Sequence, residues 1–455
     1  MGHEFSRRGF LKLGGVVAAG TSILEPKLIK LRETEEGAAW AQESEGYALK
    51  PLIKIDLTKR PQEQEVPLHN RWHPEIPPVV AVNPGAVFRI ECIDWTGGQI
   101  GNNDSANDVR DIDLTQVHYL SGPIAVNGAQ PGDLLVVDIL DIGALPTAPW
   151  GFTGIFAKEN GGGFLTDQFP EAKKAIWQFS GIYATSRHIG GVRFAGLTHP
   201  GLIGCAPSAE LLTRWNTREA DLVATDPQRV PPLAALPNPQ GALLGQLKGA
   251  EFERVAKVAA RTVPPREHGG NCDIKNLSRG SRIYFPVYVD GANLSMGDIH
   301  FSQGDGEISF CGAIEMAGWL DLHVDLIKDG MNKYGIINPI FKPGPVEPRY
   351  SEYLVFEGIS VDEQGKQHYL DAHIAYRRAC LNAIEYLKKF GYSGEQAYLL
   401  LSTAPIEGRI SGIVDIPNAC CTLAIPTEIF EFDIRPTTNG PTSAPRKQEA
   451  STTTT

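Results

Sequence analysis

Acidic residues and histidines are dense in one segment, "MGDIHFSQGDGEISFCGAIEMAG" (296–318). Imidazole and carboxylate groups are the ligands that Zn²⁺ takes in proteins, and general acid–base catalysis uses the same groups. On an extended strand Asp298 and His300 lie on the same face, so we expect both side chains to point into one cavity. The segment therefore predicts a metal site or an acid–base site. Its candidate residues are Asp298, His300, Gln303, Asp305, Glu307 and Glu315.

Two other segments, "REHGGNCDIKN" (266–276) and "DLTQVHYLSGPIAVNGAQPGD" (113–133), place polar residues beside glycines. Glycine lets the backbone turn tightly or lets a ligand come close. Simpler interpretations stay open, because an isolated "GDGE" is typical of a solvated turn and a single histidine is more often hydrogen-bonded in the core than a ligand. The spacing matches no closed zinc motif such as H-E-x-x-H. The candidates here are His268, Asn271, Cys272, Asp273 and His118.

Strands are the elements expected to position these groups. The 48 glycines and 33 prolines suit a chain with many turns, and several short segments alternate apolar and polar residues. We therefore expect a mainly β fold, with β-sandwich or barrel-like sheets and a few peripheral helices. The predicted strands are 86–93, 133–140, 281–289, 307–316 and 320–327.

Few helices are expected. One begins after Ser208, and another spans 371–390 and is ended by Gly391. Just beyond it, Ser393 and Gln396 have the spacing of a capping box.

Charge and composition limit the partners. The chain has 42 basic and 53 acidic residues, a net charge of -11, without a basic cluster, so nucleic acid is not an expected partner. No segment predicts a phosphate-binding glycine loop. The expected organisation is a signal segment (1–41), an N-terminal β-rich half (42–223), a Pro-rich excursion (224–249), a C-terminal β-rich half with most site residues (250–435) and a disordered tail (436–455).

The N-terminal stretch "SRRGFLKLGGVVAAGTSIL" resembles a twin-arginine export signal, with Arg7 and Arg8 before a mildly apolar run. The run from Leu13 to Leu24 is too short to span a bilayer, so stable membrane association is not expected. Small residues at Ala39 and Ala41 predict cleavage near position 41. We expect export through the twin-arginine translocase to the periplasm or the medium, or a cytoplasmic protein if the signal does not function.

The strings "EHGGNCDIKN", "VHYLSGP", "SFCGAIEM" and "VDIPNACCTLAIP" resemble the acetamidase/formamidase family, and the last three resemble its formamidase branch. The likeness extends over 47–435. It implies an amidohydrolase that cleaves the C–N bond of short aliphatic amides, above all formamide to formate and ammonia, in a mainly β homo-oligomer. Two alternatives remain: an acetamidase or other small-amide hydrolase, and a periplasmic protein that binds amides without turnover.

An amide carbonyl is a poor electrophile, so the site must polarise its oxygen, activate a nucleophile and protonate the leaving amine. A divalent metal with an adjacent carboxylate base would supply all three, so we expect such a metal, zinc above others, and no organic cofactor. Glu307 or Asp305 is expected to act as base and then acid. His118 is expected as a further catalytic residue that lines the pocket, and His199, Gln303 and Asn271 are expected to bind the substrate. The predicted metal ligands are His268, Asp273, Asp298, His300 and Glu315.

A cysteine nucleophile is the rival chemistry. It would act through Cys272 beside His268, and it predicts sensitivity to thiol alkylation together with indifference to chelators. The seven cysteines are otherwise expected to be reduced and buried.

Overall fold

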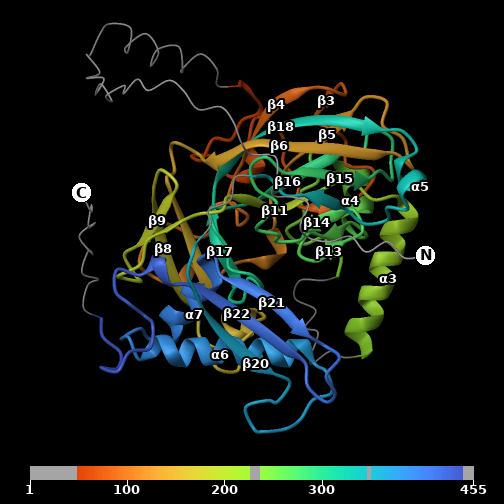
Figure 1. Cartoon of the computed structure of the whole chain (residues 1–455). Coiled ribbons are helices and arrows are strands. Elements are labelled where there is room, and N and C mark those ends of the chain that lie inside the picture. The colour runs from red at the N-terminus through yellow and green to blue at the C-terminus, as the bar shows by residue number, and fades with distance from the viewer. Residues whose placement is uncertain (1–48, 226–235, 346–349, 444–455) are drawn as a thin grey trace, which may run out of the picture. The chain divides into compact units, whose positions relative to one another are not determined.

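The computed structural model describes residues 49–225, 236–345 and 350–443 (Figure 1). The predicted signal segment lies outside the described residues, as do part of the Pro-rich excursion and the end of the predicted tail. Two large sheets dominate the described chain and helices are few, so the mainly β prediction is confirmed.

One sheet has six strands. Along β18, Leu320, Leu322 and Val324 alternate on the buried face, while Asp321 on the other face pairs with Arg89 at 2.7 Å. This is the period-two pattern of a sheet with one face in the core. The strand order is β1 (Pro51–Ile53), β4 (Val87–Cys92), β18 (Gly318–Ile327), β6 (Leu134–Ala144), β15 (Arg282–Pro286) and β19 (Ile340–Lys342).

The second sheet has eleven strands, and its central strand β16 is buried along its whole length. Strand β5 (Leu120–Val126) pairs with β16, and β3 (Val80–Val82) pairs with β5. The main order is β10 (Phe194–Ala195), β9 (Tyr183–Ser186), β8 (Lys173–Ser180), β7 (Trp150–Ile155), β17 (Phe310–Met316), β16 (Leu294–His300), β11 (His199–Gly204), β14 (Gly269–Asn271) and β13 (Pro265–Arg266).

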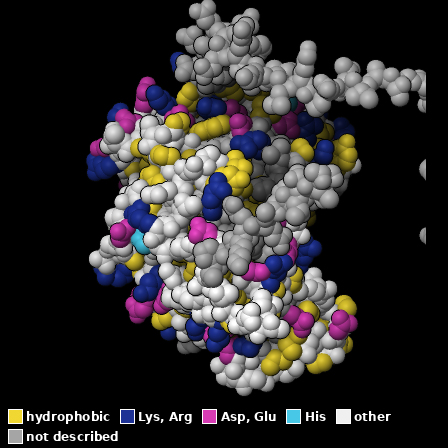
Figure 2. All heavy atoms as spheres, turned by 60° about the vertical axis from the view of Figure 1, so that its left-hand side comes forward, with side chains coloured by type: hydrophobic (Ala, Val, Ile, Leu, Met, Phe, Trp, Pro, Cys, Tyr) yellow, Lys and Arg dark blue, Asp and Glu magenta, His cyan; other side chains and the backbone are white. Residues whose placement is uncertain are grey.

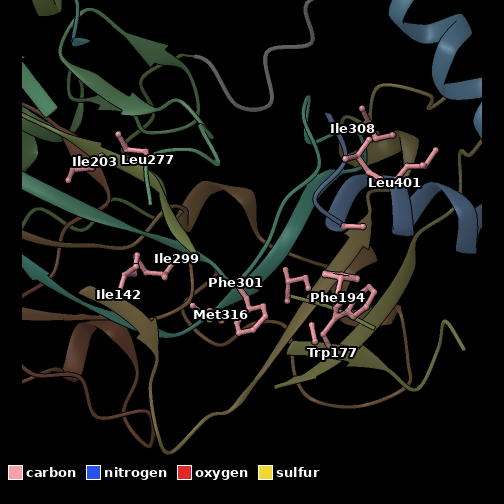
Figure 3. Close-up of a cluster of buried hydrophobic side chains, with 14 of the residues drawn as sticks. Ile142, Trp177, Phe194, Ile203, Leu277, Ile299, Phe301, Ile308, Met316 and Leu401 are labelled. Atoms are coloured by element: carbon pink, nitrogen blue, oxygen red, sulfur yellow. The ribbon is translucent and has the colours of Figure 1, made fainter. Parts of the chain in front are cut away.

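The two sheets share one hydrophobic core (Figure 3). Ile142 of the six-stranded sheet lies beside Ile299 of the eleven-stranded sheet, and Met316 and Phe301 continue the cluster. Both predicted halves of the chain contribute strands to each sheet. All five predicted strands are present, with bounds shifted by a few residues at most ends.

A smaller layer packs against the eleven-stranded sheet. It comprises the strands β20 (Tyr353–Ile359), β22 (Cys420–Pro426) and β21 (Glu407–Gly412), in that order, with helices α6 (Ala372–Lys388) and α7 (Gly394–Thr403). Both helices have a side-chain cap: Asp371 accepts from the Ile374 amide, and Ser393 with Gln396 forms the predicted capping box.

The remaining elements are short or peripheral. Helix α3 (Ala209–Thr225) follows Ser208 as predicted, and no helix of the described residues is long and apolar enough to cross a membrane. On the face shown in Figure 2, basic and acidic side chains are interspersed. The other elements are β2 (Arg71–Trp72), α2 (Asn107–Arg110), α4 (Gly249–Ala256), β12 (Ala260–Arg261), α5 (Gly330–Tyr334) and the 3₁₀ turns η2 (Pro61–Glu63), η3 (Leu114–Gln116), η4 (Lys158–Asn160) and η5 (Thr427–Ile429).

A loop rich in Asn and Asp before α2 is held by one buried lysine. Lys174 of β8 has a side chain only 1% exposed, and its Nζ lies 2.7 and 2.9 Å from the two Asp108 carboxylate oxygens. The same ammonium donates to the Gly101 carbonyl at 3.1 Å and to Asn103 Oδ1 at 3.0 Å. Four oxygen atoms therefore surround one cation. Val109 of α2 packs in one hydrophobic cluster with Trp95, so this loop also supports the Trp95 side chain.

Candidate active site

A cavity of about 420 Å³ opens on one face of the eleven-stranded sheet. Two loop regions, 95–118 and 263–273, form its walls, and the loop between β16 and β17 completes it. Its lining combines an apolar wall with a cluster of acids, as small-molecule sites commonly do. The lining residues are Trp95, Leu114, Val117, His118, Val263, Pro265, Asn271, Cys272, Asp273, Asp298, Gln303, Gly306, Glu307, Phe310 and Glu315.

His300 at the end of β16 is the centre of the acidic cluster. Its Nε2 lies 3.1 Å from Asp298 Oδ1 and 3.0 Å from Glu315 Oε2, and all three side chains are buried. The β16–β17 register brings Glu315 directly opposite His300. Asp298 and His300 thus lie together, as their shared parity predicts.

Asp273 and Glu307 approach the same imidazole from two loops. The ligand atoms of Asp273, His300 and Glu307 lie within 4.8 Å of one another. Three of the four acids have a left-handed backbone, with φ of 50° at Asp273, 54° at Asp298 and 45° at Glu307. Such conformations persist in side-chain-bearing residues only when the surrounding structure enforces them, and they concentrate at functional sites.

Burial and crowding set the charge of this cluster. Burial and the neighbouring Asp298 raise the pKa of Asp273 to about 7, and burial also raises the pKa of Glu315 to about 8. The pKa of Glu307 lies well above its ordinary value because of burial and the charges of Asp273 and Glu315. Burial acts to raise the pKa of Asp298 as well, but His300 outweighs it and lowers that pKa to about 2.

A chain of hydrogen bonds fixes the tautomer of His300. His199 Nδ1 donates to the Leu197 carbonyl at 2.7 Å, which leaves its Nε2 as an acceptor 3.2 Å from His300 Nδ1. Gln303 Nε2 donates to the Asp273 carbonyl at 2.7 Å, so its Oε1 also accepts from His300 Nδ1, at 3.0 Å. The Nδ1 proton of His300 is therefore required by both neighbours.

Burial acts to lower the pKa of His300, but Glu315 and Asp298 outweigh it and raise that pKa well above its ordinary value. A neutral His300 would turn the lone pair of Nε2 toward these two carboxylates. That arrangement is repulsive unless a proton or a metal cation lies among the three groups. Glu315 Oε2 lies 3.0 Å from His300 Nε2, yet it accepts no hydrogen bond from the described residues. Gly201 faces the same groups: a Cβ there would be 2.4 Å from His300 Cε1 and 2.8 Å from Asp298 Oδ2. Imidazole nitrogen with carboxylate oxygens fits a divalent cation such as Zn²⁺.

Three further predicted residues line the cavity. His118 is held by Thr262, whose Oγ1 lies 2.7 Å from the His118 amide and 3.0 Å from its Nδ1, and burial lowers the His118 pKa to about 4. Gln303 links the loop to Asp273, and Asn271 donates to the Val263 carbonyl at 3.2 Å. All three were expected at the pocket.

Three predicted residues lie elsewhere. His199 is fully buried behind His300 and does not line the cavity. Asp305 turns away from the cavity, toward Lys275 and the Gly408 amide. His268, predicted as a metal ligand, lies between Trp72 and Trp215, each 4.5 Å away between ring centroids. The structure does not bring it to the acidic cluster.

The geometry does not support the alternative mechanism, in which Cys272 beside His268 is the nucleophile. Cys272 lines the cavity, but burial and the neighbouring Asp273 raise its pKa to about 11, which disfavours the thiolate. No hydrogen bond joins Cys272 to a histidine of the described chain, and His268 packs against tryptophans instead. All seven cysteines are unpaired thiols, five of them buried.

Trp95, Phe310 and Gly201 lie at the site although the sequence did not predict them there. Trp95 and Phe310 contribute aromatic surface, and the Trp95 ring lies 5.1 Å from that of His118. Trp95 precedes a Gly pair and Gly201 lies in "HPGLIG", so local glycine patterns were the available signal.

Comparisons with known proteins identify the family of the chain. A model described as Acetamidase/Formamidase family matches residues 54–432. A formamidase of Methylophilus methylotrophus is 70% identical over 393 residues, 86% of this chain and 97% of the relative. An acetamidase of Mycolicibacterium smegmatis is 59% identical over 406 residues, 87% and 98% respectively. The solved structure of a gamma lactamase from Delftia acidovorans has a TM-score of 0.85 and 66% identity, covering 86% of this chain and 96% of that one.

Proposed function

The chain belongs to the acetamidase/formamidase family, and from this premise we propose that it is an amidohydrolase of short aliphatic amides, with formamide as the preferred substrate. The observation that carries the reaction type is the identity of 70% and 59% to relatives named as a formamidase and an acetamidase, over nearly their whole length. The resemblance expected from the sequence is thereby confirmed.

Glu307 is the proposed general base. It lines the cavity, and its raised pKa suits a group that takes a proton from water near neutral pH and returns it to the leaving amine. The apolar wall of Trp95, Leu114 and Val117 limits the water that reaches the reacting amide. His118, with its lowered pKa, is a neutral hydrogen-bonding group on the same wall.

We further propose that His300, Asp298 and Glu315 hold a divalent cation, zinc above others. Bound there, it would polarise the amide carbonyl and lower the pKa of water. His199 and Gln303 keep the His300 proton on Nδ1, so that Nε2 remains available to the cation. Asp273, between this group and Glu307, completes the acidic surround.

A γ-lactam is a second candidate substrate. The solved relative at 66% identity is named for action on a cyclic amide. The cavity of about 420 Å³ and its wall of Leu114, Val117 and Val263 leave room for a five-membered ring.

Discrimination against one extra methyl group is worth only roughly 10- to 200-fold, so acetamide should also turn over.

A panel of formamide, acetamide, propionamide and a γ-lactam tests these assignments. Ammonia release measures the linear amides, and appearance of a primary amine measures lactam opening. Formamide should have the highest kcat/KM. Binding of an amide in calorimetry without turnover would favour the rival amide-binding protein. Loss of activity on chelation, restored by Zn²⁺, supports the metal proposal, whereas inactivation by alkylation alone would favour Cys272.

Export and oligomer formation are also part of the proposal. The twin-arginine motif supports export with removal of residues 1–41, which lie outside the described residues. Replacing both Arg7 and Arg8 by lysine should keep the protein in the cytoplasm, and unchanged export would overturn this assignment. The family resemblance supports a homo-oligomer, which light scattering of the mature chain would test.

A further inference from the structure

The loop that carries Glu307 is fastened on its far side to the small C-terminal layer. The Gly304 amide donates to the Ser402 carbonyl at 2.7 Å, at the end of α7. The Ser309 amide donates to Ser402 Oγ at 3.1 Å. Backbone atoms on both sides of Glu307 are therefore bound to one residue that lies far along the chain.

Asp305 makes the densest set of these attachments. Its amide donates to the Ile406 carbonyl at 3.1 Å, and its carbonyl accepts from Tyr376 Oη at 2.6 Å. Its carboxylate accepts from the Gly408 amide at 2.8 Å and lies 3.0 Å from Lys275 Nζ. Lys275 Nζ also donates to the Ile406 carbonyl. Main chain and side chain of Asp305 are thus fixed together, to α6, β21 and the loop before it.

This loop is also closely packed against α7. Ile308 lies beside Leu401 of α7 in Figure 3, and Tyr398 Oη donates to the Ile308 carbonyl. A Cβ on Gly304 would be 2.1 Å from the Leu401 carbonyl oxygen. Glu307, with φ of 45°, lies between the packed residues Gly304 and Ile308. A left-handed glutamate needs such external support, because its backbone alone disfavours that conformation.

We propose that Asp305 is a positioning residue for Glu307. With Tyr376 and Lys275 it holds the loop so that the Glu307 carboxylate faces Asp273 and His300. The inference rests on the proposed function, in that Glu307 acts as the base. It assigns the layer of α6, α7 and β20–β22 a role in catalysis, although no residue of that layer lines the cavity.

Two tyrosines of α6 provide a matched test. Tyr376 donates to the Asp305 carbonyl, and Tyr386, on the same helix, donates to the Ile434 carbonyl far from the loop. Tyr376→Phe should lower kcat by roughly 10-fold or more with KM changed less than about threefold, since misplacing a catalytic group by about 1 Å can cost 10²-fold. Tyr386→Phe should lower the melting temperature comparably and leave kcat unchanged.

Asp305→Asn sharpens the test. It keeps the size of the side chain but removes the charge that faces Lys275, so kcat should fall by roughly 10- to 100-fold while bound metal is retained. Hydrogen–deuterium exchange over 303–312 supplies a readout that does not depend on activity. Exchange there should rise in Tyr376→Phe and Asp305→Asn, and not in Tyr386→Phe.

The outcomes separate the two proposals. Equal loss of kcat in Tyr376→Phe and Tyr386→Phe, or unchanged exchange over 303–312 in Asp305→Asn, would overturn the positioning role. If the wild-type protein hydrolysed no amide, the proposed function would fall. The exchange comparison would then still decide whether Asp305 and Tyr376 hold the loop.

Discussion

Two buried polar groups on the eleven-stranded sheet differ in their charge balance. At Lys174, one ammonium faces the Asp108 carboxylate and two neutral oxygens, at 2.7 to 3.1 Å. At His300, four carboxyl groups surround one imidazole. The first group has a partner for its charge, whereas in the second group burial, together with the charge of Asp298, raises the pKa of Asp273 and Glu315.

The difference distinguishes a structural role from a chemical one. A buried ion pair that is fully hydrogen-bonded holds its surroundings in place, and removing one partner is costly. A buried cluster with excess like charge destabilises the fold, so its presence in a cavity indicates a cation, a shared proton or catalysis. The four experiments that follow test this distinction, from the largest expected effect to the smallest.

His300→Ala removes the imidazole that the four carboxyl groups surround. We expect kcat to fall by on the order of 10³-fold or more, together with loss of bound metal, since the cation loses its nitrogen ligand. His323→Ala is the matched control, because His323 also lies on a strand and contacts a carboxylate, with Nδ1 2.9 Å from Asp138 Oδ2. Metal analysis and formamide kinetics on both variants decide the matter. Equal metal content in the two would contradict the assignment.

Glu307→Gln should separate the base from the metal group. A general base contributes roughly 10²- to 10⁴-fold, so the barrier should rise by about 3 to 5 kcal/mol at most. Bound metal should be retained, because Glu307 is not among the three proposed ligands. Single-turnover kinetics with metal analysis measure both effects. Activity near the wild-type level would show that another carboxyl group of the cluster acts as the base.

Lys174→Met should show the opposite pattern. It leaves the Asp108 carboxylate, whose side chain is 18% exposed, without its cation, so the free energy of unfolding should fall by about 2 to 3 kcal/mol. The kcat for formamide should fall far less than in His300→Ala, because Lys174 acts on the cavity only through the loop that packs against Trp95. Denaturant unfolding and steady-state kinetics measure these quantities. A large loss of kcat at an unchanged stability would remove the distinction between the two groups.

The pH dependence of stability gives the smallest effect. In the folded protein without metal, Glu315 keeps its proton up to about pH 8, whereas the unfolded chain releases it near the ordinary value of 4.5. The folded state therefore binds more protons in this window, and the free energy of unfolding should decrease as pH rises through it, by about 1.4 kcal/mol per pH unit at most from Glu315. Thermal unfolding of chelated protein measures the slope, which Glu315→Gln should reduce. The absence of this slope would show that Glu315 is ionised when folded.

Local sequence pattern predicted the strands and part of the site. Alternation identified β4, β6, β15, β17 and β18, and strand parity placed Asp298 with His300. Pattern failed where position depends on distant packing. His268 is five residues from Asp273, yet Trp72 and Trp215 enclose it.

The role of Asp305 could not be read from the sequence for the same reason. Its neighbours suggest an active-site acid, but its partners Tyr376 and Gly408 lie in the C-terminal layer. The apolar wall likewise comes from the region around Trp95, which lies far along the chain from the acidic residues that it faces. Residue type and density identified the chemistry, and tertiary contacts decided which residues take part.

Lys174 of β8 supplies the cation that the oxygens of the Asn- and Asp-rich loop surround. Some loops with several carboxylate and amide oxygens bind calcium, and such a loop is ordered only when the free ion exceeds its dissociation constant. Lys174 is a cation that the chain itself supplies, so its local concentration is set by a covalent tether and not by the medium. The wall that Val109 and Trp95 share can thus keep its form in solutions of very different calcium content, and a protein that passes from one such solution to another need not gain or lose an ion there.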